Sequence, residues 1–250
     1  MSMRKTILIT GASSGLGEGM ARLFAGMDRD LALCARRTDR LETLKADLEK
    51  EYPDIRVLIK PLDVTDYEQV FAVFDAFRTE LGSIDRVIVN AGIGKGQPIG
   101  TGYFHANRQT AETNFIGALA QCEAAMEIFR AQNTGHLVVM SSVSAMRGMK
   151  KNLTTYAASK AGVALLAEGI RSEMLGTPIK VTTLFPGFIR SEINEKVKST
   201  PFIVDTETGC QALVDAIEEE LPHASVPRWP WAPLGFAMRH LPLKMVSKMM

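Results

Sequence analysis

Short runs of apolar, often β-branched residues alternate along this chain with longer amphipathic stretches, and this alternation restricts the possible folds more than any other feature. Runs that are apolar throughout are typical of strands buried on both faces of a parallel sheet. They lie at Thr6–Thr10, Leu31–Cys34, Val57–Ile59, Arg86–Asn90, Leu137–Met140 and Val181–Phe185. The stretches between them predict helices at Gly15–Ala25, Arg40–Glu51, Tyr67–Leu81, Gln109–Arg130 and Ala157–Leu175. The pattern predicts an α/β fold, a doubly wound parallel sheet in a single domain.

Composition and charge exclude several classes of protein. Hydrophobic residues make up 46% of the chain and charged residues 23%, which is typical of a globular protein. The net charge of +1 gives no reason to expect a nucleic-acid partner. The three cysteines form no CxxC pair and the four histidines no HxH or HExxH pattern, so we expect neither a disulfide framework nor a metal site. Without a secretory signal or an apolar run long enough to span a bilayer, we expect a cytoplasmic protein.

A glycine- and serine-rich segment, Thr10–Gly17, joins the first expected strand to the first expected helix. Glycines permit a tight turn and let backbone N–H groups approach a pyrophosphate, and the helix N-terminus adds a partial positive charge. The spacing differs from the GxGxxG of the common Rossmann fingerprint, and an ordinary strand–helix turn is the alternative. We expect the cofactor phosphates to bind at Gly11, Ser13, Ser14, Gly15, Leu16 and Gly17.

The end of the second expected strand indicates which dinucleotide binds. NAD enzymes usually place an acid there to hold the ribose 2′-hydroxyl, but here Arg36 and Arg37 follow the strand and no acid occurs before Asp39. Guanidinium groups match the oxygens of a 2′-phosphate. The alternative is a solvated start of a helix. The sequence therefore favours NADP(H), with Arg36 preferred because it directly follows the position of the usual acid.

Tyr156 and Lys160 stand four residues apart on one expected helix and so share a face. Reduction of a carbonyl needs a proton donor, and a free tyrosine has a pKa of about 10, which a neighbouring ammonium lowers. Ser141 and Ser142 follow an expected strand, where their hydroxyls can bind a substrate oxygen. Asn114 lies among apolar and small residues, where a polar side chain needs a partner. These residue types together indicate hydride-transfer chemistry.

In this order, the motifs resemble those of a classical short-chain dehydrogenase/reductase over about residues 6–195. The family's catalytic tetrad is matched by Asn114, Ser142, Tyr156 and Lys160. The resemblance implies that Tyr156 is the general acid or base, that Lys160 lowers its pKa and bonds the nicotinamide ribose, and that Ser142 orients the substrate oxygen. It implies that Asn114 holds a water on the proton path. Ser142 is chosen over Ser141 because Val143-Ser144-Ala145 then fits the family pattern best.

The resemblance also implies cofactor contacts outside the glycine loop. Asp63 and Val64 would contact adenine, and the segment Asn90-Ala91-Gly92 the centre of the cofactor. Pro186-Gly187 matches the loop on the nicotinamide side, where Ile189 and Ser191 would approach the carboxamide. Ser191 stands where many members of the family have threonine, and both hydroxyls can bond an amide.

The C-terminal part departs from the usual family pattern. We expect a division into residues 1–195, the cofactor-binding and catalytic core, and residues 196–250, a substrate cap and amphipathic extension of the same domain. Leu234–Met250, preceded by two tryptophans, reads as a basic amphipathic helix. Such a helix serves as a lid, packs in a subunit interface or lies on a membrane surface, and composition favours the first two. It also suggests a lipophilic substrate.

The sequence therefore predicts an oxidoreductase that transfers a hydride between NADP(H) and a carbonyl or alcohol substrate. The alternative is a cofactor-binding regulatory protein without turnover, against which the intact set of Ser142, Tyr156 and Lys160 argues. We expect a small-molecule substrate bounded by the loop Ile93–Gly102 and by Val143–Leu153, and a homodimer or homotetramer. Peripheral membrane contact through the C-terminal segment stays open.

Overall fold

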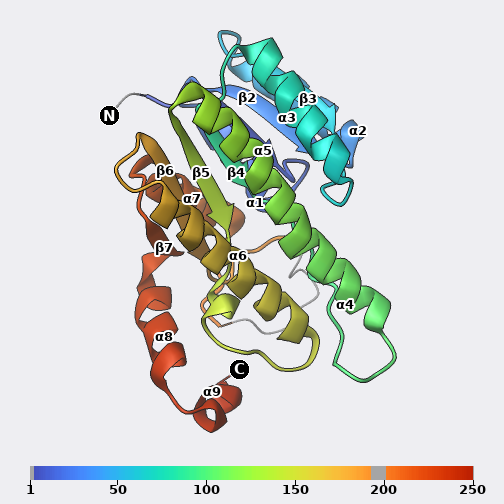
Figure 1. Cartoon of the computed structure of the whole chain (residues 1–250), viewed down its shortest axis with the longest axis vertical. Coiled ribbons are helices and arrows are strands. Elements are labelled where there is room, and N and C mark those ends of the chain that lie inside the picture. Colours follow the sequence, from blue (N-terminus) through green and yellow to red (C-terminus); the bar gives the residue numbers. More distant parts are fainter. Residues whose placement is uncertain (1–2, 193–200, 250) are drawn as a thin grey trace.

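The computed structural model describes residues 3–192 and 201–249, and a parallel sheet forms its centre (Figure 1). In this described part the sheet has seven strands in the order β3-β2-β1-β4-β5-β6-β7. They are β1 (Thr6–Thr10), β2 (Asp30–Ala35), β3 (Val57–Pro61), β4 (Arg86–Val89), β5 (Gly135–Met140), β6 (Ile179–Pro186) and β7 (His223–Val226). The strand order reverses between β1 and β4, the place where doubly wound sheets bind ligands. The predicted fold class is confirmed.

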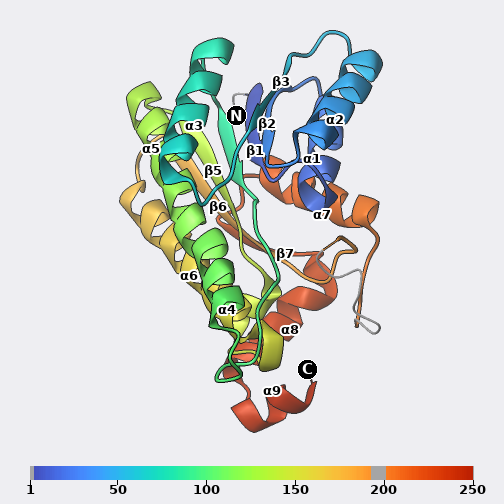
Figure 2. The ribbon, with the colours of Figure 1, turned by 90° about the vertical axis from the view of Figure 1, so that its right-hand side faces the viewer.

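Helices cover both faces of the sheet, as Figure 2 shows. One layer contains α1 (Gly15–Ala25), α2 (Thr38–Glu51) and α7 (Thr206–Glu218), and the other contains α3 (Tyr67–Leu81), α5 (Gly117–Gln132) and α6 (Thr154–Glu173). Each layer buries its own apolar cluster against the sheet. In α3, Val70, Phe74 and Phe77 are fully buried, whereas Phe71, whose spacing suggests the same face, is 36% exposed. The two cores fix the carboxyl ends of the strands relative to one another.

The predicted elements agree with the structure for the strands β1 to β6, whose bounds shift by one or two residues, and for α1 and α3. The helix expected at Gln109–Arg130 is longer and interrupted: α4 (Phe104–Ala111) passes through a π-helical turn, η1 (Glu112–Ile116), into α5. The strand β7 and helix α7 are absent from the sequence expectation. β7 is short and half-exposed, so it lacks the continuous apolar run that marks the other strands.

The C-terminal helix expected at Leu234–Met250 is in fact two helices. Helix α8 begins at Arg228 and ends at His240, and α9 covers Leu243–Met249. Pro242 separates them, because proline cannot supply the backbone N–H that would continue the helix. The proposed division between residues 195 and 196 lies outside the described residues. Among the described helices, none combines the length and apolar character needed to cross a bilayer.

Candidate active site

The glycine loop is held against the end of β4. The Thr10 hydroxyl accepts hydrogen bonds from the backbone N–H groups of Asn90 and Ala91 at 3.0 and 3.1 Å. In return, Asn90 Nδ2 donates to the carbonyl of Thr10 at 2.9 Å. Gly11 has a φ of +66°, and a Cβ there would lie 2.9 Å from the Cα of Ala91, so only glycine fits this approach. The expected cofactor residues Asn90 and Gly11 therefore lie together, with Gly92 just beyond.

The N-terminus of α1 is surrounded by groups that suit an anion. Ser14 is its N-cap, yet its hydroxyl does not cap the helix; it accepts a hydrogen bond from Arg37 Nη2 at 2.5 Å. Arg37 Nε also donates to the Ser13 hydroxyl at 3.3 Å. The backbone N–H groups of the first turn are thus left for a ligand, beside a guanidinium and a positive helix end.

A carboxylate that the sequence did not suggest lies against this group. Glu192 contacts Arg37 Nη1 at 3.0 Å and Arg40 Nη1 at 2.5 Å. The hydrogen bond from Arg40 is the main cause that lowers the pKa of Glu192, assisted by Arg37 and Ser14 against the cost of burial. Arg40 and Glu192 are 152 positions apart, and no short-range pattern links them, so neither could be found from the sequence.

Arg36 lies apart from this group and closer to the expected adenine pocket. Its Nη1 is 3.9 Å from Asp63 Oδ2, and its side chain is 61% exposed. Asp63 also accepts hydrogen bonds from the N–H and hydroxyl of Thr65 at 3.0 and 2.8 Å. Burial raises the pKa of Asp63, but the bonds from Thr65 and the charge of Arg36 outweigh it and lower the pKa. The neighbouring Val64 is buried in the core.

The π-helical turn places Asn114 beside the end of β4. Its side chain is 1% exposed and exchanges two hydrogen bonds of 2.8 Å with the backbone of Ile93. A Cβ at Gly92 would lie 3.2 Å from Asn114 Oδ1 and 3.5 Å from Lys160 Nζ, so these two side chains meet there. The polar partner that the sequence requires for Asn114 is therefore the backbone of Ile93.

Ser142 and Tyr156 meet across the segment that connects β5 to α6. Ser142 is the N-cap of a short 3-10 turn, η2 (Val143–Met146), and accepts a hydrogen bond from the N–H of Ser144 at 3.1 Å. Burial raises the pKa of Tyr156, and the hydrogen bond with the Ser142 hydroxyl opposes this rise. The direction differs from the expected lowering by Lys160, because burial of the phenol is the larger effect in this structure.

Lys160 reaches the end of β5 rather than the tyrosine. Its Nζ donates to the carbonyl of Met140 at 2.7 Å, and the Ser141 hydroxyl donates to the carbonyl of Lys160 at 2.7 Å. Burial lowers the pKa of Lys160 to about 8. The two serines therefore have different contacts. Ser141 connects β5 to α6 by a hydrogen bond, and Ser142 faces Tyr156.

The segment after β6 crosses over the glycine loop. Ile189 is 3% exposed and forms a parallel bridge with Val204, and Ser191 lies beside Gly15. Gly187 follows Pro186 at the end of β6, and a Cβ there would lie 2.0 Å from Trp231 Nε1 of α8. Glycine is therefore required at position 187 by the indole that packs on it. Of the two expected nicotinamide-side residues, Ser191 therefore lies beside the glycine loop, and Ile189 is packed against Val204 and Gly209.

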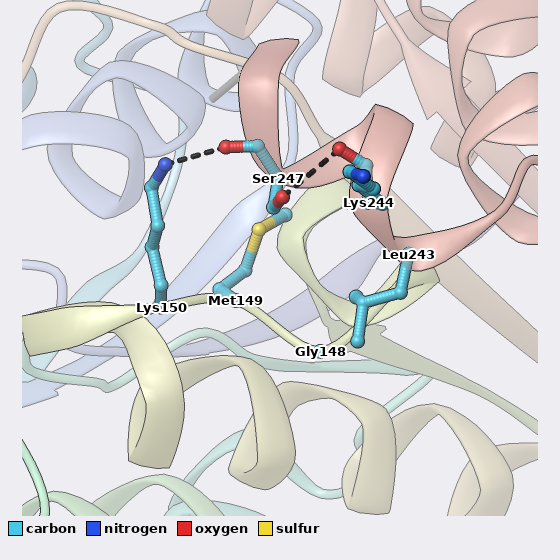
Figure 3. Close-up of a pocket in the computed structure, with 6 residues that line it drawn as sticks. All are labelled: Gly148, Met149, Lys150, Leu243, Lys244 and Ser247. Atoms are coloured by element: carbon cyan, nitrogen blue, oxygen red, sulfur yellow. Dashed lines mark hydrogen bonds between the residues drawn. The ribbon is translucent and has the colours of Figure 1, made fainter.

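The rim of the site carries apolar grooves. One, of about 470 Å³, lies between the loop Pro98–Gly102, the start of α4 and Thr155. Another groove, of about 560 Å³, lies between Gly148–Lys150 and α9. Figure 3 shows the residues that line it. Met149 is buried with Ala157, Met238 and Val246, so it belongs to a core shared with α8 and α9. In residues 3–192 and 201–249, no group of three or more His, Cys, Asp or Glu side chains is placed to hold a metal ion.

Comparison with known proteins identifies the family. The model of the short chain dehydrogenases matches residues 5–201. An uncharacterized oxidoreductase of Mycobacterium tuberculosis is 54% identical, covering 98% of this chain and 97% of the relative. The 11-beta-hydroxysteroid dehydrogenase 1A of Arabidopsis thaliana is 30% identical, covering 90% of this chain and 69% of the relative. The crystal structure of levodione reductase has a TM-score of 0.79 at 26% identity, covering 90% and 95% of the two chains. The chain belongs to the short-chain dehydrogenases, a family of oxidoreductases.

Proposed function

We propose that this protein transfers a hydride between NADP(H) and a carbonyl or alcohol substrate, with Tyr156 as the general acid or base. One observation carries the proposal: the Ser142 hydroxyl interacts with the Tyr156 phenol, and Asn114 Oδ1 and Lys160 Nζ both lie within 3.5 Å of the Cβ position of Gly92. A protein that only bound a dinucleotide would have no use for this arrangement. The residues around the N-terminus of α1 would be sufficient for binding the dinucleotide.

The residues around α1 fit a dinucleotide with a 2′-phosphate. Two serine hydroxyls, the uncapped first turn of α1 and the guanidinium groups of Arg37 and Arg40 converge there. When bound, the nicotinamide supplies or accepts the hydride. The proposed contacts are Gly11, Ser13, Ser14, Gly15, Leu16, Gly17, Arg36, Arg37, Asp63, Val64, Asn90, Ala91, Gly92, Tyr156, Lys160, Pro186, Gly187, Ile189 and Ser191.

In the direction of reduction, the protonated phenol of Tyr156 donates its proton to the substrate oxygen. Its raised pKa keeps the phenol protonated at neutral pH, which suits this role. The Ser142 hydroxyl orients and polarises the same oxygen. Lys160 lies one helical turn from Tyr156 and bonds the Met140 carbonyl; in this proposal its positive charge favours the phenolate that the transfer leaves, while Asn114 fixes the backbone at Ile93. In the direction of oxidation, Tyr156 takes the proton back.

We propose a lipophilic substrate, and the apolar residues packed near the site support this choice. Val143, Phe185 and Trp231 form a buried cluster with Met146 and Phe188 packed against it. We propose that α8 caps the substrate through this cluster, within the division of residues 1–195 and 196–250 given above. One relative bears the name of a hydroxysteroid dehydrogenase, and a steroid is a lipophilic alcohol.

Turnover tests the catalytic proposal. NADPH oxidation is followed with a panel of short and long-chain ketones and aldehydes, for the wild type and for Tyr156→Phe. We expect kcat to fall by roughly 10²- to 10⁴-fold in the variant, because the proton donor is lost. Tyr67→Phe, at an exposed tyrosine on α3, is the matched control. Equal rates for wild type and Tyr156→Phe would remove the mechanism, and tight NADPH binding without turnover would favour the regulatory alternative.

A comparison of KM for NADPH and for NADH tests the proposed roles of Arg36 and Arg37. Arg36→Ala and Arg37→Ala are each expected to raise KM for NADPH by roughly 10- to 100-fold, since a hydrogen bond to a charged group contributes about 1.5–3 kcal/mol. KM for NADH is expected to change little. Arg78→Ala is the control, because Arg78 pairs with Asp75 on the exposed face of α3. Equal losses for both cofactors would mean that neither arginine recognises the 2′-phosphate.

We also propose that the protein acts in the cytoplasm as a homodimer or homotetramer. Support for assembly comes from exposed apolar side chains on the α4–α6 side, among them Phe104 and Leu165. Light scattering after gel filtration measures the assembly, and a mass equal to 27.4 kDa would contradict it.

A further inference from the structure

The outer face of α8 and α9 exposes large apolar side chains. Trp229, Phe236 and Met245 are between 52% and 79% exposed, and Leu243, which is 58% exposed, lies at the edge of this face and lines the groove beside Gly148. Scattered exposed apolar residues are ordinary, but a group of this size on two consecutive helices is not. Figure 1 shows both helices at one extremity of the molecule, beyond the carboxyl ends of the strands.

The inner face of the same helices is well anchored, so the exposure does not come from a loosely attached segment. Trp231, Gly235 and Met238 are buried along one side of α8, and Val246 of α9 is fully buried. Met238 and Val246 pack with Met149 and with Ala157, the neighbour of Tyr156. The outer face is therefore held in a fixed orientation next to the opening of the cleft.

The charged side chains in the two segments that form this extremity are all basic. From Val143 to Val163 and from Arg228 to Met250 the chain contains no aspartate or glutamate. Exposed basic side chains in these segments are Lys150, Lys151, Arg228, Arg239 and Lys244. Lys150 Nζ is 2.5 Å from the carbonyl of Ser247, which joins the two segments into one surface. Because the whole chain has a net charge of only +1, the rest of the molecule is net acidic.

Charge decides which partner fits this surface. In a two-fold dimer the same patch would face itself, and the basic side chains of two copies would repel one another. An anionic bilayer is complementary instead: its headgroups attract lysine and arginine, while tryptophan and phenylalanine enter the boundary between headgroups and acyl chains. The combination of apolar and basic side chains is that of a helix that lies on a membrane.

We propose that the outer face of α8–α9, together with Lys150 and Lys151, docks this protein on an anionic lipid surface. The docking goes beyond the proposed turnover and does not depend on it. It turns the opening of the cleft, beside the buried contacts of Met149 and Ala157, toward the source of lipophilic molecules. The substrate then reaches the cleft from the bilayer instead of crossing water.

Vesicle binding tests the proposal with the full chain. We expect the wild type to sediment with vesicles of phosphatidylcholine and phosphatidylglycerol at low salt, and to stay in solution with phosphatidylcholine alone or at high salt. Arg239→Gln/Lys244→Gln is expected to weaken the partition roughly 30-fold, because each basic residue near the surface contributes about 1 kcal/mol. Trp229→Ser/Phe236→Ser is expected to weaken it roughly tenfold or more by removing inserted apolar area.

Matched variants on other surfaces control for general effects of charge and exposed area. Lys50→Gln/Lys180→Gln removes two exposed charges, and Met3→Ser/Leu175→Ser two exposed apolar side chains, away from α8 and α9. These should bind as the wild type does. The proposal fails if the wild type does not sediment with anionic vesicles, or if the α8–α9 variants bind as well as the controls. It also fails if light scattering shows an oligomer that Trp229→Ser/Phe236→Ser dissociates, because a second copy would then cover the face.

Discussion

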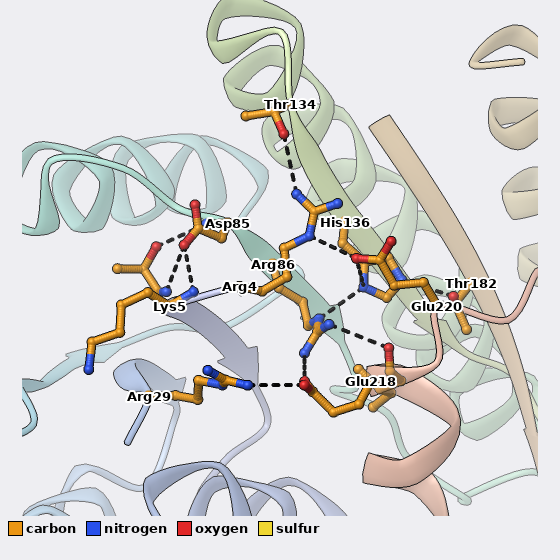
Figure 4. Close-up of polar contacts among 12 residues, drawn as sticks. Arg4, Lys5, Arg29, Asp85, Arg86, Thr134, His136, Thr182, Glu218 and Glu220 are labelled. Carbon is orange, nitrogen blue, oxygen red and sulfur yellow. Dashed lines mark hydrogen bonds and ion pairs between the residues drawn. The ribbon is translucent and has the colours of Figure 1, made fainter. Parts of the chain in front are cut away.

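The two ends of the parallel sheet use polar side chains in opposite ways. At the carboxyl end, Asn114 and Lys160 bond mainly to backbone carbonyl and N–H groups, and the Tyr156 phenol interacts with the Ser142 hydroxyl. At the amino end, charged side chains bond one another in a closed network, which Figure 4 shows. Burial is similar at both ends, so the difference lies in the partners.

Glu218 of α7 is the centre of the amino-end network. Its carboxylate pairs with Arg29 Nη2 at 3.0 Å and with Arg86 Nη1, whose guanidinium also lies over the ring of Phe24. Arg86 is 1% exposed, and burial is the main cause that lowers its pKa, against the attraction of Glu218. The network therefore fixes α7, β4 and the start of β2 to one another.

His136 continues the network across β5. Its Nδ1 accepts a hydrogen bond from Arg86 Nε at 2.9 Å, so Nε2 holds the proton and donates to the Thr182 hydroxyl at 2.8 Å. Burial, with the charges of Arg86 and Arg4, holds the pKa of His136 well below its ordinary value, and the ring is neutral. Arg4 itself pairs with Glu220 at 2.8 Å.

The comparison teaches that stability and chemistry are placed at separate ends of one sheet. At the amino end, the charges are paired with one another inside the fold, and these pairs hold α7 and the strands together. A polar side chain held by the backbone is fixed equally well and still presents an atom to the cleft. Substitutions at the two ends should therefore affect different measurements, which the following predictions test.

The largest effect is expected for Glu218→Ala. The change leaves Arg86 buried without its carboxylate, which costs about 3–5 kcal/mol in the free energy of unfolding and lowers Tm by roughly 6–20 °C. Urea and thermal unfolding measure it. Glu219→Ala, at the exposed adjacent residue, should change Tm little. The kcat of the folded fraction should equal that of the wild type. A loss of kcat without a loss of stability would contradict the idea that stability and chemistry lie at separate ends of the sheet.

A smaller effect concerns pH at the carboxyl end. Because burial lowers the pKa of Lys160 to about 8, its ammonium loses the proton well below the usual pH of 10.5. We expect kcat/KM for reduction to fall about tenfold per pH unit above this value. Lys160→Arg keeps the positive charge and should move the falling limb upward, whereas the exposed Lys180→Arg should not. A wild-type profile that stays flat to pH 10 would contradict the assignment.

The smallest effect is expected for Thr182→Val. Valine keeps the volume but leaves His136 Nε2 without an acceptor, at a cost of about 1–2 kcal/mol. Thr43→Val, at an exposed hydroxyl that bonds only within α2, is the control. Unfolding in urea measures the difference. An unchanged free energy of unfolding would mean that Thr182 does not stabilise the network. A change in KM for the cofactor would show that the amino end influences the candidate site.

Much of the fold was predictable because the strands are buried on both faces. Apolar runs locate β1 to β6, and Tyr67–Leu81 is marked at both ends, by Asp66 as N-cap and by Gly82 with a φ of +86°. β7 was not predicted, because its residues are half-exposed and its position depends on pairing with β6. The break at Pro242 had a signal in the sequence, which the amphipathic pattern on either side obscured.

At the candidate site, each position next to a strand end could be predicted, whereas contacts between distant segments could not. Thr10 ends β1, and Asn90 and Ser142 lie within two residues of the ends of β4 and β5. The contacts of Glu192 with Arg37 and Arg40, and of Trp231 with Gly187, join segments that have no fixed spacing. The same holds for the amino-end network, whose members come from β4, β5, β6 and α7. Such pairs depend on the completed fold.

The bond from Ser141 to Lys160 and that from Lys160 to Met140 have a consequence for how this chain can change. They align α6 with β5 without using any residue between Val143 and Leu153. Changes of sequence in that interval would therefore leave Tyr156 in register with the sheet. The residues that we expect to border the substrate could then vary as a separate module, while the proposed chemistry stays the same.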